Sequence, residues 1–544
     1  MALTDEQLIE AGVRTGLIEA NQLERLKKDA RRQRSPILPM ILAHYRFPST
    51  ALYRAMAENK GIRFIDLNGR KAHAESLKKV PASLIKRKQL LPIIEGDNVL
   101  LVVSDPNDRG TIDTVQRLLG KQLELVMADV ALLNLQLERL FANTSKETEV
   151  VDETDLVTLL DSIIREAYLN QASDIHFVTE EEGLRVRLRV DGRLRDYPVV
   201  ADAAVAAGLV SRVKVLSGLD IAEQRQPQDG GFSYHLAAPI DVEFNVRVAT
   251  APTRLGERIT MRLLGQDSGG ITLTDLGMLP KDLERFKVAI EKPYGLILLT
   301  GPTGSGKSTT LFAALQEIND PEINIMTVEN PIEYVMDGVS QIQIGHKISF
   351  ADALRSLLRH DPDVLMVGEI RDHETADVAV KAAMTGHMVF STLHTNNAVS
   401  AVTRLIDIGC EAFLIGSTLT AVIAQRLVRR LCIHCRKPHT ATPAECELLG
   451  VADPVEIYDA VGCAVCQGRG YRGRLGVFET LWFDEHLSRL VAQGGSEDEI
   501  EATAGNNLQF MWEDGSQKVL NGMTSLAELQ AVAMHKTHDM MRHT

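Results

Sequence analysis

The chain has 544 residues, more than one compact domain holds, and at roughly 100–200 residues per domain three or four domains are expected. Hydrophobic residues make up 45% of the chain and charged residues 24%, ordinary globular usage that excludes a largely disordered or fibrous protein. The net charge of −14, from 59 Lys and Arg against 73 Asp and Glu, argues against a protein that binds nucleic acid over its whole surface. It still allows local clusters of basic residues.

Neither a membrane span nor a secretion signal is expected. No stretch reaches the ~18 uninterrupted apolar residues that a membrane-spanning helix needs. The beginning, MALTDEQLIE, has acidic residues where a signal peptide needs a basic and then an apolar run. Six cysteines in a chain of this length do not make a disulfide scaffold, and four of them form two C-x-x-C pairs. A reducing, cytosolic compartment is therefore predicted.

Residues 1–142 are predicted to form an N-terminal region, helical over 1–68 and α/β over 69–142. Its first segment places apolar residues at helical spacing. The stretch LLPIIEGDNVLLVVSDP, which starts at Leu90, predicts two strands around a turn. The segment 143–155 is polar and charged, which predicts a linker.

A middle domain is predicted over residues 156–266. It begins with a helical pattern and continues into two alternating stretches, 184–197 and 240–250, which predict antiparallel strands. From about 271 to 544, buried strands alternate with helices, which predicts an α/β domain built on a parallel sheet.

A phosphate-binding loop follows a short apolar strand, GLILLT. The sequence GPTGSGKSTT after it satisfies G-x-x-x-x-G-K-[ST] and runs into a helical pattern. Glycines let the backbone wrap around phosphates, the lysine reaches the outer phosphates, and the Ser308 hydroxyl can ligate Mg²⁺. The alternative is a degenerate loop that binds nucleotide weakly or not at all. The predicted nucleotide-binding residues are Gly301, Pro302, Thr303, Gly304, Ser305, Gly306, Lys307, Ser308 and Thr309.

Two acidic sites and two histidines lie downstream of this loop. One apolar strand ends on Glu329 and Glu333, and another, VLMV, is followed by Glu369. A third strand is flanked by His387 and His394. Apolar strands that end in acids fit the ligand-binding edge of a parallel sheet. The alternatives are surface glutamates and structural histidines.

Four cysteines have the spacing of a metal site. Cys432 and Cys435 form one C-x-x-C pair, and Cys463 and Cys466 form the other. Two such pairs can close a tetrahedral shell of thiolates, which favours structural Zn²⁺. The loop 436–462 between them is longer than the usual ~15–20 residues. The alternative is two unligated, reduced pairs.

The motifs GPTGSGKSTT, TVENPIEY, LRHDPDVLMVGEIRD and GHMVFSTLHTNNA, in this order, resemble the Walker A, Asp-box, Walker B and His-box of the type II/type IV secretion ATPase superfamily. The resemblance covers about residues 155–535. It implies a P-loop RecA-like ATPase domain, a PAS-like α+β middle domain, a zinc-binding insert over 430–475 and an α/β N-terminal region. It also implies ATP, Mg²⁺ and Zn²⁺ as cofactors.

The resemblance implies roles for the acids and histidines. Glu333 would be the catalytic glutamate, with Glu329 as the second candidate, and Glu369 would help to hold Mg²⁺ or its water. His387 and His394 would sense or contact the γ-phosphate. One departure is Asn330, where the family commonly has Asp.

Arginines in such motors neutralise charge on the transferred phosphoryl group. The resemblance implies that they lie in the middle domain, where Arg212 and Arg225 match the family best and Arg247 and Arg262 are further candidates. Arg355 and Arg359, on the helix predicted before DPDV, match further arginines of the family. We expect that Arg225→Ala leaves nucleotide binding nearly intact and sharply reduces hydrolysis.

The N-terminal region resembles that of secretion and pilus-assembly ATPases. LIEAGVRTGLIEANQLERL is similar to a helical module that binds cyclic di-GMP in some relatives, but Gln7, Ile9 and Asp29 depart from that pattern. Docking to an inner-membrane platform protein or its cytoplasmic adaptor is therefore preferred over dinucleotide binding.

The function that the resemblance implies is a hexameric ATP-hydrolysing motor. It would power assembly of a type IV pilus or a type II secretion pseudopilus through an inner-membrane platform protein. The alternatives are a pilus-retraction motor, which typically lacks the four cysteines, a DNA-uptake or DNA-transport motor, and a non-hydrolysing nucleotide-sensing scaffold. No nucleic-acid partner is expected.

Overall fold

A computed structural model describes residues 4–533 apart from 34–36, 46, 48, 66, 68–71, 96–97, 121–122, 131–132, 135–136, 138–152, 182, 198, 200–201, 237–240, 266–270, 346–347 and 464. The predicted linker over 143–155 therefore falls mostly outside the described residues. Two compact units are present. The first contains Met1–Gln266 with two short later segments, Cys432–Cys435 and Val461–Gly470. The second contains Asp267–Leu431, Arg436–Ala460 and Tyr471–Thr544.

Four helices begin the first unit and share one apolar core. In the first helix, Thr4 accepts a hydrogen bond from the Gln7 backbone and Gln7 caps Thr4 in return, which satisfies two free N–H groups of the first turn. Leu8, Ile18 and Leu52 are buried together in the core of these helices. Their bounds are α1 Asp5–Arg14, α2 Ala20–Gln33, α3 Ile37–Tyr45 and α4 Ser49–Asn59.

A small α/β subdomain follows, with strand order β1-β4-β3-β2. The hairpin predicted from Leu90 is present, because β2 pairs antiparallel with β3 and Ile93 faces Leu100. Gly120 adopts the left-handed conformation that ends the helix before β4. The elements are β1 Arg63–Phe64, α5 Ala74–Lys79, α6 Ala82–Lys88, β2 Leu90–Glu95, β3 Asn98–Val103, α7 Arg109–Leu119 and β4 Glu124–Met127.

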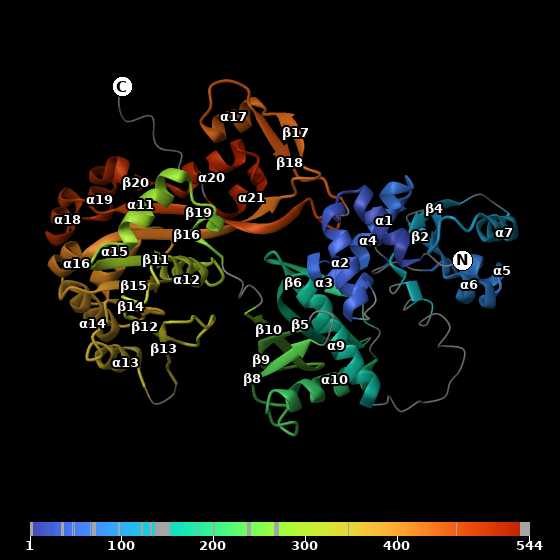
Figure 1. The fold of residues 1–544 in the computed structure, drawn as a ribbon, viewed down its shortest axis with the longest axis horizontal. Helices are drawn as coiled ribbons and strands as arrows, with labels where there is room; N and C mark the ends of the chain where they lie inside the picture. Colours follow the sequence, from blue (N-terminus) through green and yellow to red (C-terminus); the bar gives the residue numbers. More distant parts are fainter. Residues whose placement is uncertain are drawn as a thin grey trace. The chain divides into compact units, whose positions relative to one another are not determined.

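The middle domain is an antiparallel sheet of six strands in the order β7-β6-β5-β10-β9-β8, with two helices over one face (Figure 1). Alternation along β9 and β10 places Val246, Val248 and Ile259 in the core, and polar residues point to the other face. The elements are α9 Glu153–Leu169, β5 Ala172–Glu180, β6 Gly183–Val190, β7 Arg193–Tyr197, α10 Ala203–Leu216, β8 Gln228–Leu236, β9 Val242–Thr253 and β10 Gly256–Leu264.

The second unit is built on an eight-stranded sheet in the order β13-β12-β14-β15-β11-β16-β19-β20. The six strands from β13 to β16 in this order run parallel to one another. The last two pairs, β16 with β19 and β19 with β20, are antiparallel. The predicted α/β domain on a parallel sheet is therefore confirmed. The strands are β11 Gly295–Thr300, β12 Ile325–Glu329, β13 Ser340–Gln343, β14 Val364–Val367, β15 Met388–Leu393, β16 Leu419–Leu431, β19 Tyr471–Trp482 and β20 Leu508–Gln509.

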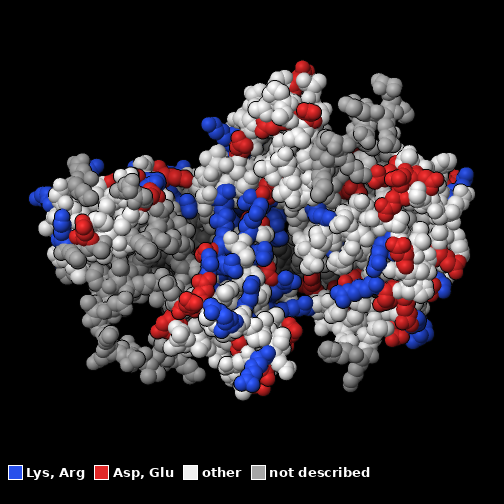
Figure 2. All heavy atoms as spheres, turned by 180° about the vertical axis from the view of Figure 1, so that it is seen from behind, with Lys and Arg blue, Asp and Glu red and all other residues white. Residues whose placement is uncertain are grey.

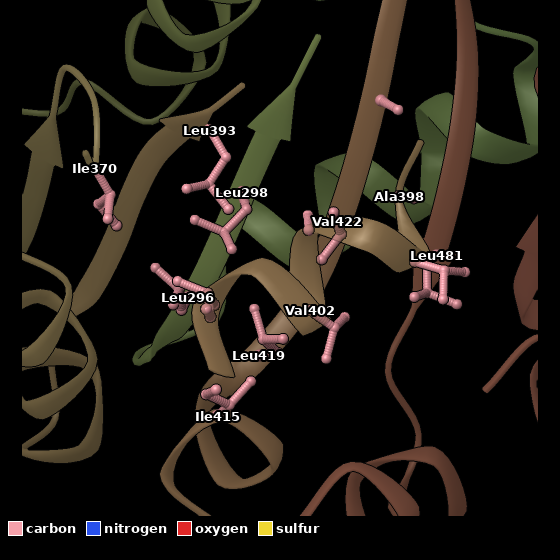
Figure 3. Close-up of a cluster of buried hydrophobic side chains, with 14 of the residues drawn as sticks. Leu296, Leu298, Ile370, Leu393, Ala398, Val402, Ile415, Leu419, Val422 and Leu481 are labelled. Carbon is pink, nitrogen blue, oxygen red and sulfur yellow. The ribbon is translucent and has the colours of Figure 1, made fainter. Parts of the chain in front are cut away.

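Helices cover both faces of this sheet, which explains why its central strands read as continuous apolar runs. Every residue of β11 is buried. Leu296 and Leu298 pack on one face, where Leu393, Ile415 and Val422 join them (Figure 3). The alternate residues of β11 pack on the other face. The helices are η1 Leu273–Leu276, α11 Pro280–Ile290, α12 Lys307–Glu317, α13 Phe350–Leu357, α14 His373–Met384, α15 Val399–Asp407, α16 Ala412–Thr418, α18 Glu485–Ala492, α19 Glu497–Ala504, η2 Gly505–Asn507, α20 Met511–Leu520 and α21 Leu526–Val532.

A short insert separates β16 from β19. It contains a two-stranded ribbon and one helix, namely β17 Lys437–Thr440, α17 Pro443–Leu449 and β18 Glu456–Asp459. Cys446 on α17 is buried in the core of the second unit, as is Cys410, and neither belongs to the cluster of four cysteines. Among the described residues, no helix combines the length and apolar character that crossing a bilayer requires.

Candidate functional site

The phosphate-binding loop joins β11 to α12 in the middle of the parallel sheet. Gly301, Gly304 and Gly306 have φ angles of 142°, 77° and 89°, which L-residues with a Cβ rarely adopt. At Gly301 an added Cβ would lie 2.5 Å from the Gln425 carbonyl oxygen, and at Gly306 it would lie 2.8 Å from the Gln425 Nε2. Gly301 and Gly306 are therefore required both by the backbone conformation and by the strand beneath the loop, and Gly304 by its backbone conformation.

Two polar groups of this loop fit a bound phosphate. Lys307 is 8% exposed, and its Nζ donates to the carbonyl oxygens of Gly301 at 2.7 Å and Pro302 at 3.2 Å. The Ser305 hydroxyl is buried without a hydrogen-bond partner among the described residues. Burial lowers the pKa of Lys307, and the Glu369 carboxylate opposes this shift. An anion in the loop would stabilise the charged lysine and give Ser305 a partner.

The other predicted nucleotide-binding residues lie along the same turn. Pro302, Thr303 and Gly304 are exposed at its tip. Ser308 and Thr309 are half-buried in the first turn of α12, where free N–H groups and the helix dipole favour an anion. The Ser308 hydroxyl is placed in sequence and in the fold where a Mg²⁺ ligand of a P-loop is needed.

Glu329 is the last residue of β12 and Glu369 follows β14, and because both strands run parallel to β11 the two glutamates lie at the same edge of the sheet as the phosphate loop. Glu329 is 4% exposed and accepts hydrogen bonds from Thr327 at 2.6 Å and Gln341 at 2.9 Å. Burial raises the pKa of Glu329, and the nearby Glu333 adds to the rise. Glu333 itself is exposed, so its carboxylate is open to water.

Glu369 lies between a cation and a histidine. Its Oε1 is 2.8 Å from the Arg371 guanidinium, and its Oε2 is 3.5 Å from His394 Nε2. The segment around it is held by Thr392, whose hydroxyl donates to the Gly368 carbonyl oxygen at 2.7 Å. The structure thus brings His394 and Glu369 together at the loop edge of the sheet.

His387 lies at the opposite edge. It precedes β15 and His394 follows it, and seven steps of ~3.3 Å each along the extended chain separate the two histidines by about 23 Å. His387 Nδ1 is 2.9 Å from the Ala382 carbonyl oxygen at the end of α14. The structure therefore places His387 and His394 at opposite ends of β15, and the expectation that His387 senses or contacts the γ-phosphate stays a prediction.

Gln425 and Arg426 on β16 form the floor of the loop, and they are not among the residues that the sequence motifs predict. Gln425 is 2% exposed and accepts a hydrogen bond from Thr310 in α12 at 2.8 Å. Arg426 donates to the carbonyl oxygens of Gln425 and Asn396, each at 3.1 Å, which connects the loop floor to the segment after His394. Burial lowers the pKa of Arg426. No local motif marks these two residues, because only the pairing of β16 with β11 brings them to the loop.

The candidate arginines of the second unit lie around α13. Arg355 contacts Glu374 at 2.7 Å and Asp352 at 3.2 Å, and these carboxylates raise its pKa. Arg359 lies beyond the end of α13, and its guanidinium donates to the Arg355 carbonyl oxygen at 3.2 Å. The two side chains therefore share one surface, as their spacing predicts.

The remaining candidate arginines belong to the first unit. Arg212 is half-buried on α10, and Arg225 is exposed in the segment before β8. Arg247 and Arg262 are direct partners on β9 and β10. Arg262 contacts the buried Asp174 at 2.9 Å. The outer face of this sheet also carries Arg185, Arg187, Arg189 and Arg258. Figure 2 shows that Lys and Arg side chains gather in bands on the molecular surface.

The four cysteines of the two C-x-x-C pairs converge. Their sulfur atoms all lie within 4.8 Å of one another. Cys432 and Cys463 are 3.9 Å apart, and Cys435 and Cys466 are 3.7 Å apart. Four thiolates at about 2.3 Å from a tetrahedral Zn²⁺ would lie about 3.8 Å from one another, so the donor set fits this ion. Burial raises the pKa of the Cys435 thiol to about 11, which a bound cation would reverse.

Family comparison matches most of the chain. Residues 149–531 match the family described as "Type II/IV secretion system protein", and residues 61–147 match the MshEN domain. The type II secretion system protein E of Pseudomonas aeruginosa is 41% identical over 85% of this chain and 97% of its own length. The type IV pilus assembly ATPase PilB of Myxococcus xanthus is 35% identical over 95% of this chain and 97% of its own length.

Comparison of solved structures supports the fold. The ATPase DotB of Legionella pneumophila aligns with a TM-score of 0.52 and 24% identity, over 71% of this chain and 97% of the DotB chain.

Proposed function

This chain belongs to the Type II/IV secretion system protein family, and we propose that it is an ATP-hydrolysing motor of the assembly type. It converts ATP and water to ADP and phosphate and powers assembly of a type IV pilus or a type II secretion pseudopilus. The observation that carries the proposal is the loop edge of the sheet, where Lys307, Glu369 and His394 converge beside a glycine loop shaped for phosphate. The curated relatives named for type II secretion and pilus assembly support the biological role.

In the proposed site, the loop backbone and Lys307 bind the β- and γ-phosphates. Ser308 and Glu369 would hold a Mg²⁺ ion, directly or through its water, and the ion would offset the charge of the phosphates. His394 lies 3.5 Å from Glu369, which would orient it toward the γ-phosphate. Glu333 orients the attacking water because its carboxylate is exposed, whereas Glu329 is held by Thr327 and Gln341.

The oligomer and the partners are also part of the proposal. A ring, by family resemblance a hexamer, would bring middle-domain arginines, with Arg212 and Arg225 as the first candidates, to a nucleotide and stabilise the transferred phosphoryl group. The region of residues 1–142 would dock to an inner-membrane platform protein or a cytoplasmic adaptor. The motor would then act at the cytoplasmic face of the inner membrane through these partners.

Nanomolar to micromolar binding of cyclic di-GMP in a titration would instead favour a dinucleotide-responsive N-terminal region.

The experiment that tests the function combines chemistry and genetics. Phosphate release by the purified chain should require both ATP and Mg²⁺. Deletion of the gene should abolish either surface pili or secreted enzymes, and scoring the two separately decides between the pilus and the secretion machine. A strain that retains both would contradict the proposal. Loss of pilus retraction with normal assembly would favour the retraction motor, and loss of DNA uptake alone would favour the DNA-transport motor.

The four cysteines are proposed to hold one structural Zn²⁺. Metal analysis of freshly purified protein is expected to find about one zinc per chain. Cys435→Ser removes one of four thiolate ligands, so it should reduce the zinc content severalfold or more. Cys446→Ser is the matched control, because Cys446 is buried away from the cluster and should leave the zinc content unchanged. Zinc well below one per chain in the unaltered protein would refute the site.

Arg426 is proposed to position the phosphate loop against the segment after His394. Arg426→Ala removes two hydrogen bonds from a charged donor, each worth about 1.5–3 kcal/mol, so kcat/KM for ATP should fall about 100-fold or more. Arg430→Ala is the matched control, because Arg430 is exposed on the same strand. Arg426→Lys should recover only part of the loss, since an ammonium group cannot reach both carbonyl oxygens in the same way. Unchanged kinetics in Arg426→Ala would refute the role.

A further inference from the structure

The two cysteine-bearing segments belong to a different compact unit from the rest of their insert. Cys432–Cys435 and Val461–Gly470 are part of the first unit, while Arg436–Ala460 between them is part of the second. The strand β16 of the ATPase sheet ends at Leu431, immediately before the first cysteine, and β19 begins at Tyr471. The cysteine segments are therefore neighbours of β16 and β19 in sequence, but they pack within the first unit.

These segments share one apolar core with the N-terminal helices. Cys432, Val465 and Cys466 are 2%, 5% and 0% exposed. They are buried in the same cluster as residues of α1 and α4, among them Leu8, Ile9, Leu52, Ala55 and Met56. Two of the four metal ligands are thus core residues of the helical module, although more than 350 residues separate them in sequence from α4.

Polar contacts also position the second cysteine segment, Val461–Gly470. The Arg54 guanidinium of α4 lies over the Phe64 ring, 4.4 Å from its centroid. The same guanidinium leaves no room for a Cβ at Gly468, which would lie 2.6 Å from Arg54 Nη1. The same segment also contacts the middle domain, because Arg469 forms an ion pair with Asp191 in the β6–β7 turn at 3.1 Å. The two side chains are 9% and 11% exposed.

A bound metal would fix the conformation of the two cysteine segments. The cysteine segments come from two separate stretches, and four metal–thiolate bonds would join them. Within the second segment, the N–H groups of Cys463 and Gly470 donate to the Cys466 sulfur at 3.2 and 3.1 Å, which is the usual outer support of a metal-bound thiolate. The donor set therefore holds Val465, Gly468 and Arg469 in the conformation that contacts α4 and the middle domain.

We propose that the zinc element is the docking surface for the chain's own N-terminal helices. It fixes α1 and α4 to the two cysteine segments, Cys432–Cys435 and Val461–Gly470, which belong to the same compact unit as these helices. This inference rests on the zinc site proposed above. It assigns the metal a role in holding the N-terminal module and none in the chemistry of hydrolysis.

The test is hydrogen–deuterium exchange of the full-length chain, with zinc content measured on the same samples. Val465→Asp places a carboxylate in the apolar contact and leaves all four thiols. Exchange in peptides covering residues 5–14 and 49–59 should become on the order of tenfold faster or more, while one zinc per chain is retained. Val461→Asp is the matched control, because Val461 is 59% exposed in the same segment, and its exchange should match the unaltered protein. Strands β11 and β15 should remain protected in both variants.

A second variant acts from the helical side of the contact. Arg54→Ala removes the guanidinium that covers Gly468 and should accelerate exchange in the same two peptides without loss of zinc. Arg25→Ala, an exposed position on α2, is its control. Removal of zinc with a chelator should produce the same local acceleration in the unaltered chain. Unchanged exchange of α1 and α4 in zinc-loaded Val465→Asp and Arg54→Ala, or after chelation, would overturn the inference. Absence of zinc from the unaltered protein would instead overturn the zinc site itself.

Discussion

Lys307→Ala is expected to reduce ATP hydrolysis by at least about 100-fold, the effect of removing one preorganised donor from a developing anion. Lys307 Nζ now donates to the carbonyl oxygens of Gly301 and Pro302, so the ammonium group already points into the loop that would hold the phosphates. An alanine removes this charge and leaves the backbone cradle intact. Phosphate release under saturating ATP measures the loss directly.

The control for this variant is Lys292→Ala, an exposed lysine after α11, which should hydrolyse ATP at the normal rate. Lys307→Arg retains a cation but not its compact shape, so it should recover little activity. In the organism, the Lys307→Ala allele should reproduce the deletion in the pilus and secretion assays. Hydrolysis within a fewfold of the unaltered protein would contradict the assignment of the phosphate loop.

Glu333→Gln is expected to lower kcat by about 10²–10⁴-fold while ATP affinity changes little, as for loss of a group that orients or deprotonates the attacking water. Glu333 is exposed, whereas Glu329 is buried and accepts hydrogen bonds from Thr327 and Gln341. A glutamine at 329 can accept both hydrogen bonds, so Glu329→Gln should lower kcat much less. Single-turnover hydrolysis together with binding of a fluorescent ATP analogue separates the two effects. A larger loss in Glu329→Gln than in Glu333→Gln would move the catalytic role to Glu329.

Glu329→Gln is also expected to change the pH dependence of stability. The folded-state pKa of Glu329 is raised above the ordinary value of 4.5, so the folded chain holds this proton more tightly than the unfolded chain. Its contribution to stability therefore falls as pH rises from about 4.5 through the folded-state pKa. The Tm of Glu329→Gln relative to the unaltered protein should be higher at pH 8 than at pH 5.

Much of the proposed site is readable from local sequence. A glycine loop between an apolar strand and a helix has one well-defined use, and two C-x-x-C pairs need only converge to form a metal site. Glu369 and His394 could be placed at one sheet edge because each follows a strand of a parallel sheet. These inferences hold because the chemistry depends on residues close in sequence, or on strand direction, which the alternation of strands and helices determines.

Other features depend on which strands become neighbours. His387 and His394 flank the same strand and were equivalent candidates, but the extended strand carries them to opposite edges of the sheet. Gln425 and Arg426 have no local signature, and they reach the phosphate loop because β16 pairs with β11. Strand order in a sheet is decided by packing across the whole domain, so a single stretch of sequence does not contain it.

The sequence by itself determined the family motifs, the phosphate loop, the two C-x-x-C pairs and the α/β character of the second unit. The tertiary structure alone decided which glutamate is buried, which histidine contacts Glu369, and where the four cysteines lie. Cys466 is completely buried against helices from the opposite end of the chain. The periodicity and spacing of the sequence do not predict this contact, because the burial of one segment against a distant one depends on how the whole core is assembled.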